Sequence, residues 1–558
     1  MKFFFHCPFR ALVAVMLVKG LLVSCTSGTE PLGSFNVVEA TIPAMQQALA
    51  EGRVTSRELV EAHLLRIALY EERVNAVIAV NANALTEADS LDLERAQGRV
   101  RGPLHGIPVA LKDNIQTTTM PTTGGAMAFR DYVPPYEATL TANLRQAGAI
   151  ILAKTVMTEL ANFTASGMPG NYSAIGGYGL NPYDPRRDPR EGRNDGRPVL
   201  GVGGSSSGIG TAMSFWAANV GTETSGSILS PANANMLAAI KPTVGRVSRW
   251  GIIPITSDQD TAGPMARTVT DVAILLGVLE GNRPDPNDPS TSRCERPANG
   301  DYTAFLRADG LQGARIGIPR AYYYDEVNVP GTTDMSGRLS EAGRAIMREV
   351  IQILQAQGAI VIDPANIPSV VDPDPENNLL SSPSSSVLSY GMKRDFNDWL
   401  LTLGVSAPVK SLTELREWNL AHQPSGAIKY GQARLDGADD IDLQDSREIY
   451  QADRERDLRL NAEHGIDEVM TKLELDALLF PGANGAGISA KPGYPTVMVP
   501  FATLTTEADP PLPAGFDPKP RRFGVSFAGM ACSEPRLIEL AYAFEQATRR
   551  RSAPPGMP

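Results

Sequence analysis

Histidine and cysteine are both scarce in this chain. Its 558 residues include five histidines and four cysteines, and no cluster of the two has the spacing of a zinc site. No phosphate-binding loop is apparent, so we expect no metal and no cofactor. A Ser-His-Asp triad stays open as an alternative because its members need not be close in sequence, although His422 and His464 have no serine motif nearby.

Positive charge is also limited. The 51 Lys and Arg residues against 62 Asp and Glu give a formal net charge of −11, so we expect no general affinity for nucleic acid. A short basic run ends at Arg551, and we expect residues 551–558 to be a disordered, solvated tail. Hydrophobic residues make up 42% and charged residues 20% of the chain, which is typical of a soluble globular protein.

Residues 1–24 have the features of an export signal. Lys2 and Arg10 give a charged start, and residues 11–18 form a wholly apolar run. This run is too short to be a convincing membrane span, and the pattern is typical of a cleaved signal peptide. We therefore expect an exported protein, periplasmic or held at the cell envelope, with secretion as the alternative. Residues 25–37 are expected to be a linker.

The four cysteines divide into two pairs. Cys7 lies in the signal and Cys25 follows it directly, at the end of residues 22–25 (LVSC), which resemble a bacterial lipobox. This predicts lipid attachment at Cys25 and membrane anchoring, with an incidental cysteine in an ordinary secretory signal as the alternative. Cys294 and Cys532 remain for the folded body. Export permits a disulfide between them, and two free cysteines are equally compatible with the sequence.

Apolar segments with strand character alternate with helical patterns along the chain. Residues 107–112 and 149–154 are apolar runs that end in lysine, and a helical pattern over 139–147 precedes the second. Residues 316–319 and 359–362 are later strand candidates. Alternation of this kind predicts an α/β layered fold.

Two clusters of serine and glycine lie close together, at residues 203–208 and 221–228. A flexible linker has such a composition, but residues 212–218 between the clusters read as a short buried helix. Ser206 satisfies the G-x-S-x-G pattern of a nucleophile elbow. That pattern is weak here because little apolar sequence precedes it to form the supporting strand.

Lys112 is a better candidate base than any histidine. It follows an apolar strand, and burial disfavours the charged form of a lysine and lowers its pKa. A neutral amine then accepts a proton from serine. The alternative is a structural salt bridge between Lys112 and Asp113 or another carboxylate, and spacing alone favours that alternative.

Several segments in order along the chain resemble the amidase signature family. They are residues 103–114, 203–245, 258–267, 490–496 and 523–547. The resemblance implies a Ser-cisSer-Lys hydrolase with an α/β/α fold, in which a mixed central sheet is covered by helices on both faces. It spans residues 38–550, which we expect to form a single domain.

The resemblance also implies a role for individual residues. Lys112 matches the general base and Ser227 the nucleophile. Ser205 matches the bridging serine, which sits on a cis peptide bond in the family and passes protons between the other two. The oxyanion hole would consist of the N–H groups around Thr224, Ser225, Gly226 and Ser227.

Departures from the family pattern are few. Ser205 and Ser227 lie slightly closer in sequence than usual, which leaves open whether Ser205 or an adjacent serine is the bridge. Ser225 replaces a residue that is often Gly or Asp. Leu229 stands where many members have Arg, so a substrate carboxylate beside the amide is not expected. These motifs are most similar to those of peptide amidases and broad acylamidases.

The expected reaction is hydrolysis of a small-molecule or peptide carboxamide through an acyl-serine intermediate, giving a carboxylic acid plus ammonia or an amine. Ester hydrolysis at the same site is one alternative. A second is the role of the amidase-like chain of an amidotransferase, which works in a cytosolic complex on aminoacyl-tRNA; the export signal and the acidic composition argue against it. A third is a lipoprotein that only binds amides.

Specificity is expected to come from two segments. They are a variable cap around residues 364–440 and the loop 181–198, which is rich in Pro, Asp, Arg and Gly. The sequence of neither segment indicates which substrate is bound.

Overall fold

The computed structural model describes residues 35–557. The predicted signal peptide, the lipid site at Cys25 and most of the predicted linker lie outside these residues. Within the described part, no helix combines the length and apolar character that a membrane span requires.

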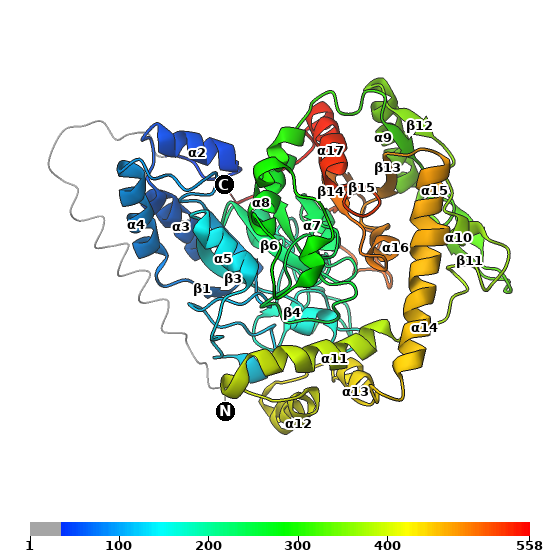
Figure 1. The fold of residues 1–558 in the computed structure, drawn as a ribbon, viewed down its shortest axis with the longest axis horizontal. Helices are drawn as coiled ribbons and strands as arrows, with labels where there is room; N and C mark the ends of the chain where they lie inside the picture. The colour runs from blue at the N-terminus through cyan, green and yellow to red at the C-terminus, as the bar shows by residue number, and fades with distance from the viewer. Residues whose placement is uncertain (1–34, 558) are drawn as a thin grey trace.

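One mixed sheet of 11 strands forms the centre of the molecule (Figure 1). Its strands, in spatial order, are β1 (Val77–Val80), β3 (Ile150–Thr155), β2 (Pro108–Lys112), β6 (Ala218–Glu223), β8 (Thr261–Ala266), β7 (Ala238–Lys241), β14 (Thr496–Leu504), β15 (Arg521–Ala528), β13 (Ala477–Pro481), β9 (Arg315–Gly317) and β12 (Ile360–Ile362). β2 pairs in parallel with both β3 and β6, whereas β6, β8 and β7 pair antiparallel. Two small hairpins, β4 (Tyr172–Ser173) with β5 (Gly177–Tyr178) and β10 (Glu326–Asn328) with β11 (Met335–Gly337), lie outside the sheet.

Helices surround the sheet (Figure 1). They are α2 (Ile42–Ala50), α3 (Ser56–Val74), α4 (Ala84–Ala96), α5 (Thr139–Gln146), α6 (Ile209–Ala212), α7 (Leu229–Ala234), α8 (Val269–Glu280), α9 (Glu341–Ala356), α10 (Pro368–Val371), α11 (Val387–Thr402), α12 (Leu412–His422), α13 (Ala433–Asp439), α14 (Arg447–Leu458), α15 (Asp467–Lys472), α16 (Ala486–Ala490) and α17 (Glu534–Thr548). A π-helical segment, Arg459–Ile466, joins α14 to α15.

Helices cover both faces of the sheet, as the resemblance implies. Along β7, Ala238 and Ile240 pack in the cluster that contains the apolar residues of α8. Ala239 between them packs instead with Leu229 and Ala232 of α7. Because successive residues of a strand point to opposite faces, α8 and α7 lie on opposite sides of the sheet. The α/β prediction is therefore confirmed.

One local prediction is wrong. Residues 212–218 do not form a helix: α6 ends at Ala212, Ser214 has a positive φ of 54°, and β6 begins at Ala218. The indole of Trp216 folds back over α6, where a Cβ at Gly210 would lie 2.1 Å from the ring. Burial of this large side chain against a glycine favours a tight return into the sheet over a continued helix.

The C-terminal segment differs from the expected disordered tail. Arg551 forms an ion pair with Glu39 at 2.8 Å, and the carbonyl of Met557 accepts a hydrogen bond from Arg66. The Met557 side chain is buried. These contacts attach residues 551–557 to the start of the domain. The composition of the tail did not reveal that Arg551 pairs with Glu39.

Cys294 and Cys532 form a disulfide across 238 residues of sequence, with their Cα atoms 5.4 Å apart. Of the two alternatives that the sequence left open, the structure has the paired one. The bond connects the loop after α8 to the turn before α17. Helices α8 and α17 pack against each other on one side of the sheet.

Candidate active site

The two Gly/Ser clusters lie against each other, although the sequence between them includes a short helix and a strand. A Cβ at Gly204 would lie 3.0 Å from both the Gly226 carbonyl oxygen and the Cα of Ser227. The N–H of Ser206 donates to the carbonyl of Ser227 at 3.1 Å. Only glycine permits this close approach of two backbones, which brings the predicted bridge and the predicted nucleophile into one site.

Lys112 ends β2 and is fully buried. Its Nζ lies 3.0 Å from Ser205 Oγ, 3.0 Å from the Thr222 carbonyl oxygen and 2.8 Å from Thr222 Oγ1. β2 and β6 are parallel neighbours, so the lysine at the end of one strand reaches the end of the other. The structure thus brings Lys112 and Ser205 together, as the family resemblance implies.

Burial lowers the pKa of Lys112 to about 7, and the negative charges of Asp260 and Glu223 oppose this effect. An ordinary lysine has a pKa of about 10.4, so a substantial fraction of Lys112 is neutral near pH 7. The alternative of a Lys112–Asp113 salt bridge is wrong, because Asp113 pairs with buried Lys154 at 3.3 Å. Lys112 is therefore available as a base.

Thr222 orients the lysine amine. A neutral amine has two N–H groups and one lone pair. The two oxygens of Thr222 accept the N–H groups, which leaves the lone pair for the hydroxyl proton of Ser205. Asn114 Nδ2 donates to Thr222 Oγ1 at 3.1 Å and fixes this hydroxyl in turn. Sequence reasoning missed both residues, and their only signal is their position within the quoted motifs.

Among the three consecutive serines, Ser205 is the one that contacts Lys112. Ser206 Oγ donates to the Thr222 carbonyl at 3.0 Å and accepts from the Thr222 N–H at 3.2 Å. Ser207 Oγ accepts from the Ile209 N–H at 3.4 Å. The geometry therefore supports Ser205 as the bridge and gives Ser206, the residue of the G-x-S-x-G pattern, a role in tying the loop to β6.

The expected cis peptide bond at Ser205 is not found. Within residues 35–557, the cis bonds join Asp363 to Pro364 and Asp509 to Pro510. The carbonyls at Gly204 and Ser205 are held by the protein: Asn171 Nδ2 donates to Gly204 O at 2.8 Å, and the Thr158 N–H donates to Ser205 O at 3.2 Å. These bonds fix the loop in the observed conformation without a non-prolyl cis bond, which is intrinsically unfavourable.

Ser227 lies in the turn between β6 and α7. Its side chain is largely buried, and its hydroxyl has no hydrogen-bond partner among the described residues. Glu223 stabilises the turn because its carboxylate accepts from the N–H groups of Ile228 at 2.6 Å and Leu229 at 2.9 Å. This leaves Ser227 free to act as a nucleophile on a rigid turn.

The same turn provides donors for an oxyanion. In the described part of the chain, the N–H groups of Ser225, Gly226 and Ser227 have no internal acceptor, and Gly226 has a positive φ of 83°. Thr224 is engaged through its side chain, which donates to Asp260 at 2.5 Å. Unpaired N–H groups beside a free serine are the arrangement that stabilises a tetrahedral oxyanion.

A cavity of about 220 Å³ opens beside the residues that contact Lys112 and is lined by Asn114, Thr222 and Thr224. Residues of the segment 249–261 and of helix α11 complete its walls. No group of three or more metal-ligating side chains occurs in residues 35–557.

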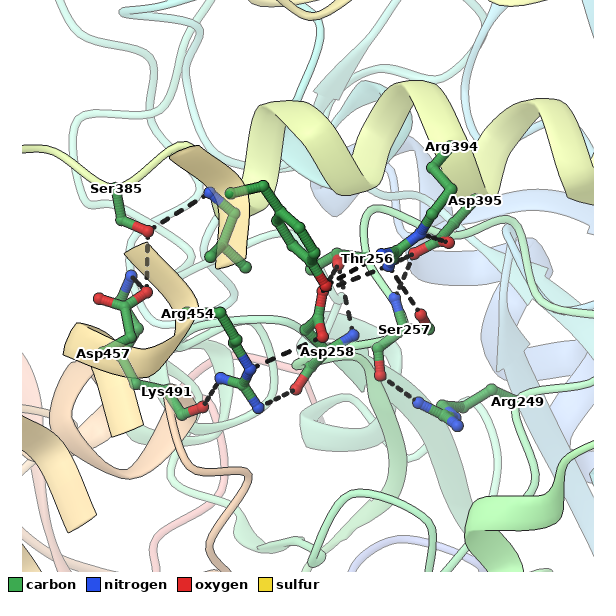
Figure 2. A network of polar contacts seen from close by, with 12 residues as sticks. Arg249, Thr256, Ser257, Asp258, Ser385, Arg394, Asp395, Arg454, Asp457 and Lys491 are labelled. Carbon is green, nitrogen blue, oxygen red and sulfur yellow. Dashed lines mark hydrogen bonds and ion pairs between the residues drawn. The ribbon is translucent and has the colours of Figure 1, made fainter. Parts of the chain in front are cut away.

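A polar network docks the cap on this cavity (Figure 2). Arg394 of α11 forms ion pairs with Asp258 at 3.2 Å and with Asp395 at 2.6 Å. The N–H of Ser257 donates to Asp395 at 2.5 Å, and Arg454 of α14 reaches Asp258 at 3.6 Å. The cap helices are thereby held against the loop that lines the cavity.

A buried lysine in contact with a serine hydroxyl, on a mixed sheet between helical layers, is the arrangement expected of the amidase class. The chain belongs to the amidase family, an amide-hydrolysing family whose model, described as Amidase, matches residues 58–538.

Similar proteins span nearly the whole chain. A probable amidase of Arabidopsis thaliana, At4g34880, is 33% identical over 569 residues and covers 99% of each chain. The solved structure of peptide amidase from Stenotrophomonas maltophilia has a TM-score of 0.77 at 34% identity, covering 94% of this chain and 99% of that one. A glutamyl-tRNA(Gln) amidotransferase chain of Synechococcus sp. (strain CC9605) is 30% identical, and the match covers 92% of this chain and 97% of that one.

Proposed function

We propose that this protein hydrolyses carboxamides through an acyl-Ser227 intermediate, with Ser205 as proton relay and Lys112 as base. The observation that carries the proposal is the 3.0 Å contact between Lys112 Nζ and Ser205 Oγ, made by a lysine whose pKa burial lowers to about 7. A base with a pKa near the working pH is the most effective kind.

In the first half-reaction, Ser227 Oγ attacks the amide carbon and gives its proton to Ser205, which passes its own proton to Lys112. The N–H groups of the 225–227 turn stabilise the oxyanion. Collapse of the tetrahedral intermediate breaks the C–N bond, and Lys112 returns the proton through Ser205 to the leaving nitrogen. The products of this half-reaction are ammonia or an amine and acyl-Ser227.

In the second half-reaction, water attacks the acyl-Ser227 carbon. Its proton travels to Lys112 through Ser205, and it returns to Ser227 Oγ when the C–O bond breaks and the carboxylic acid leaves. The relay is restored at the end of each turnover, so no cofactor is required.

Primary amides are the proposed substrates, including C-terminally amidated peptides. The similarity to a solved peptide amidase over 94% of this chain supports this choice. Esters are a second class because the same acyl chemistry cleaves them. Matched amide and ester substrates with one acyl group separate the two activities by their values of kcat/KM.

We also propose that the protein is exported and lipid-anchored. The N-terminal signal features and the Cys294–Cys532 disulfide support export, since structural disulfides persist mainly outside reducing compartments. A role within a cytosolic amidotransferase complex conflicts with both features. Co-purification of the native chain with further amidotransferase components would instead favour that role.

The test of the catalytic proposal is the activity of single variants on a panel of primary amides. Ser227→Ala, Ser205→Ala and Lys112→Ala should each lower kcat/KM by at least about a thousandfold. Ser207→Ala is the matched control, because Ser207 lies in the same loop without contacting Lys112. Full turnover by Ser227→Ala would refute the assignment of the nucleophile.

A further inference from the structure

The proposed function assigns no role to the cavity beside Lys112. Asn114 and Thr222, which orient Lys112, form part of its wall. When a primary amide is cleaved, the leaving group is ammonia and requires no cavity. The recess therefore receives the acyl part of the substrate, an inference that rests on the proposed function.

The size and walls of the cavity limit the acyl part. Its volume of about 220 Å³ is below the roughly 300–1,000 Å³ of common ligand pockets, which corresponds to one amino-acid-sized group. Trp250 stacks on Tyr136 with ring centroids 5.2 Å apart, and Trp399 of α11 is another aromatic residue of the lining. Aromatic faces accept both apolar chains and cations.

Two charged residues of the cavity lining, Arg249 and Asp395, are paired with residues of opposite charge. Arg249 is the cationic residue of the lining and forms an ion pair with Asp288 at 2.6 Å. Asp395 forms an ion pair with Arg394 at 2.6 Å. These pairs hold the loop and the cap in place, and they leave no unpaired cation among the lining residues to attract an anionic substrate.

Two carboxylates of the lining remain without an ion-pair partner. Asp398 of α11 is exposed and makes no hydrogen bond or ion pair with any residue in the described part of the chain. Asp260 is half-buried, and its carboxylate accepts from Thr224 and from the N–H groups of Ile255 and Thr256. Desolvation raises the pKa of Asp260 to about 6, so it adds negative charge above that pH. The cavity is therefore aromatic and negative, and Asp398 is the exposed carboxylate of its lining.

We propose that the enzyme prefers amides whose acyl part carries a positively charged group, and that Asp398 is a specificity-determining residue that binds this group. The cation lies between the Asp398 carboxylate and the indole faces of Trp250 and Trp399. Carboxylate and aromatic face together attract a cation more strongly than either alone.

The test compares N-acetyl-lysinamide with N-acetyl-norleucinamide, which have side chains of similar size and differ in charge. The wild-type enzyme should show a kcat/KM about threefold to tenfold higher for the lysine amide, and added salt should reduce the difference. Asp398→Asn should remove most of the preference by lowering kcat/KM for the lysine amide much more than for the norleucine amide.

Asp440→Asn is the matched control, since Asp440 is an exposed aspartate of the cap that does not line the cavity. It should retain the wild-type preference. Equal rates for both substrates in the wild type, or an equal loss in both variants, would overturn the proposal. Hydrolysis of the neutral amide without a charge preference would overturn this inference alone, whereas inactivity on every amide would overturn the proposed function.

Discussion

The role of Thr222 is the prediction that tests the proton path most sharply. Both oxygens of Thr222 contact Lys112 Nζ, at 3.0 Å and 2.8 Å, and they leave one direction open for the proton of Ser205. Thr222→Val removes Oγ1 with little change in shape and keeps the carbonyl. Thr222→Ser is the control because it keeps both oxygens.

The expected effect follows from the charge of the lysine. A hydrogen bond to a charged group contributes about 1.5–3 kcal/mol, and one pKa unit corresponds to about 1.4 kcal/mol. Loss of the Oγ1 acceptor disfavours the ammonium form, so the pKa of Lys112 should fall by about one to two units in Thr222→Val. In Thr222→Val one N–H of Lys112 has no acceptor to fix its direction, so the lone pair of Lys112 Nζ is no longer held toward Ser205. We therefore expect kcat to fall about tenfold to a hundredfold.

The assay is the pH profile of kcat/KM, which reports groups of the free enzyme. Protonated Lys112 cannot accept a proton, so wild-type kcat/KM should rise with pH through about 7. Thr222→Val should move this midpoint to lower pH and lower the plateau, and Thr222→Ser should change neither by much. A midpoint and plateau that stay at wild-type values in Thr222→Val would refute the reasoning.

Three further outcomes are expected. Gly204→Ala should abolish most activity, because the added Cβ would lie 3.0 Å from the Gly226 carbonyl oxygen and from the Cα of Ser227. Gly201→Ala should stay active, because a Cβ there would have no atom within 4 Å. Equal activities of the two variants would contradict the close-approach argument. The free energy of unfolding of the wild type should rise between about pH 7 and 10.5, because over this range Lys112 binds a proton in the unfolded state and not in the folded state. Lys112→Met should lack this rise when both proteins are unfolded in denaturant at a series of pH values. Parallel pH curves for the two proteins would argue against the lowered pKa. Replacing Cys294 and Cys532 by serine should lower the melting temperature, since closing a loop of this length stabilises by up to about 5 kcal/mol; an unchanged melting temperature would count against the disulfide.

The candidate catalytic residues were assigned from the sequence mainly through the resemblance of several ordered motifs to one family. Lys112 ends an apolar run, and burial at a strand end lowers the pKa of a lysine unless nearby carboxylates outweigh the desolvation. Ser227 stands in a glycine-rich turn that only small residues form. The alternation of strand and helix patterns predicted a layered α/β fold. Ordered motifs over most of the chain then indicated the family, and the family implied helices on both faces of a mixed sheet.

Other features depend on contacts between distant segments, which no local pattern contains. The orientation of Lys112 by Thr222 and Asn114 requires β2 and β6 to be parallel neighbours. The return of residues 212–218 into the sheet results from burial of Trp216 against Gly210. The tail at Arg551 is held by Glu39, 512 positions away in sequence.

Trapping the intermediate tests the central claim most directly. The reaction is quenched in acid during turnover of an amide, or its matched ester, whose acyl-enzyme hydrolyses slowly. The masses of the intact protein and of its proteolytic peptides are then measured by mass spectrometry. The account predicts a single acyl adduct on the peptide that contains Ser227, absent from Ser227→Ala. An adduct on Ser205 or Ser206, or turnover in Ser227→Ala with no adduct, would contradict it.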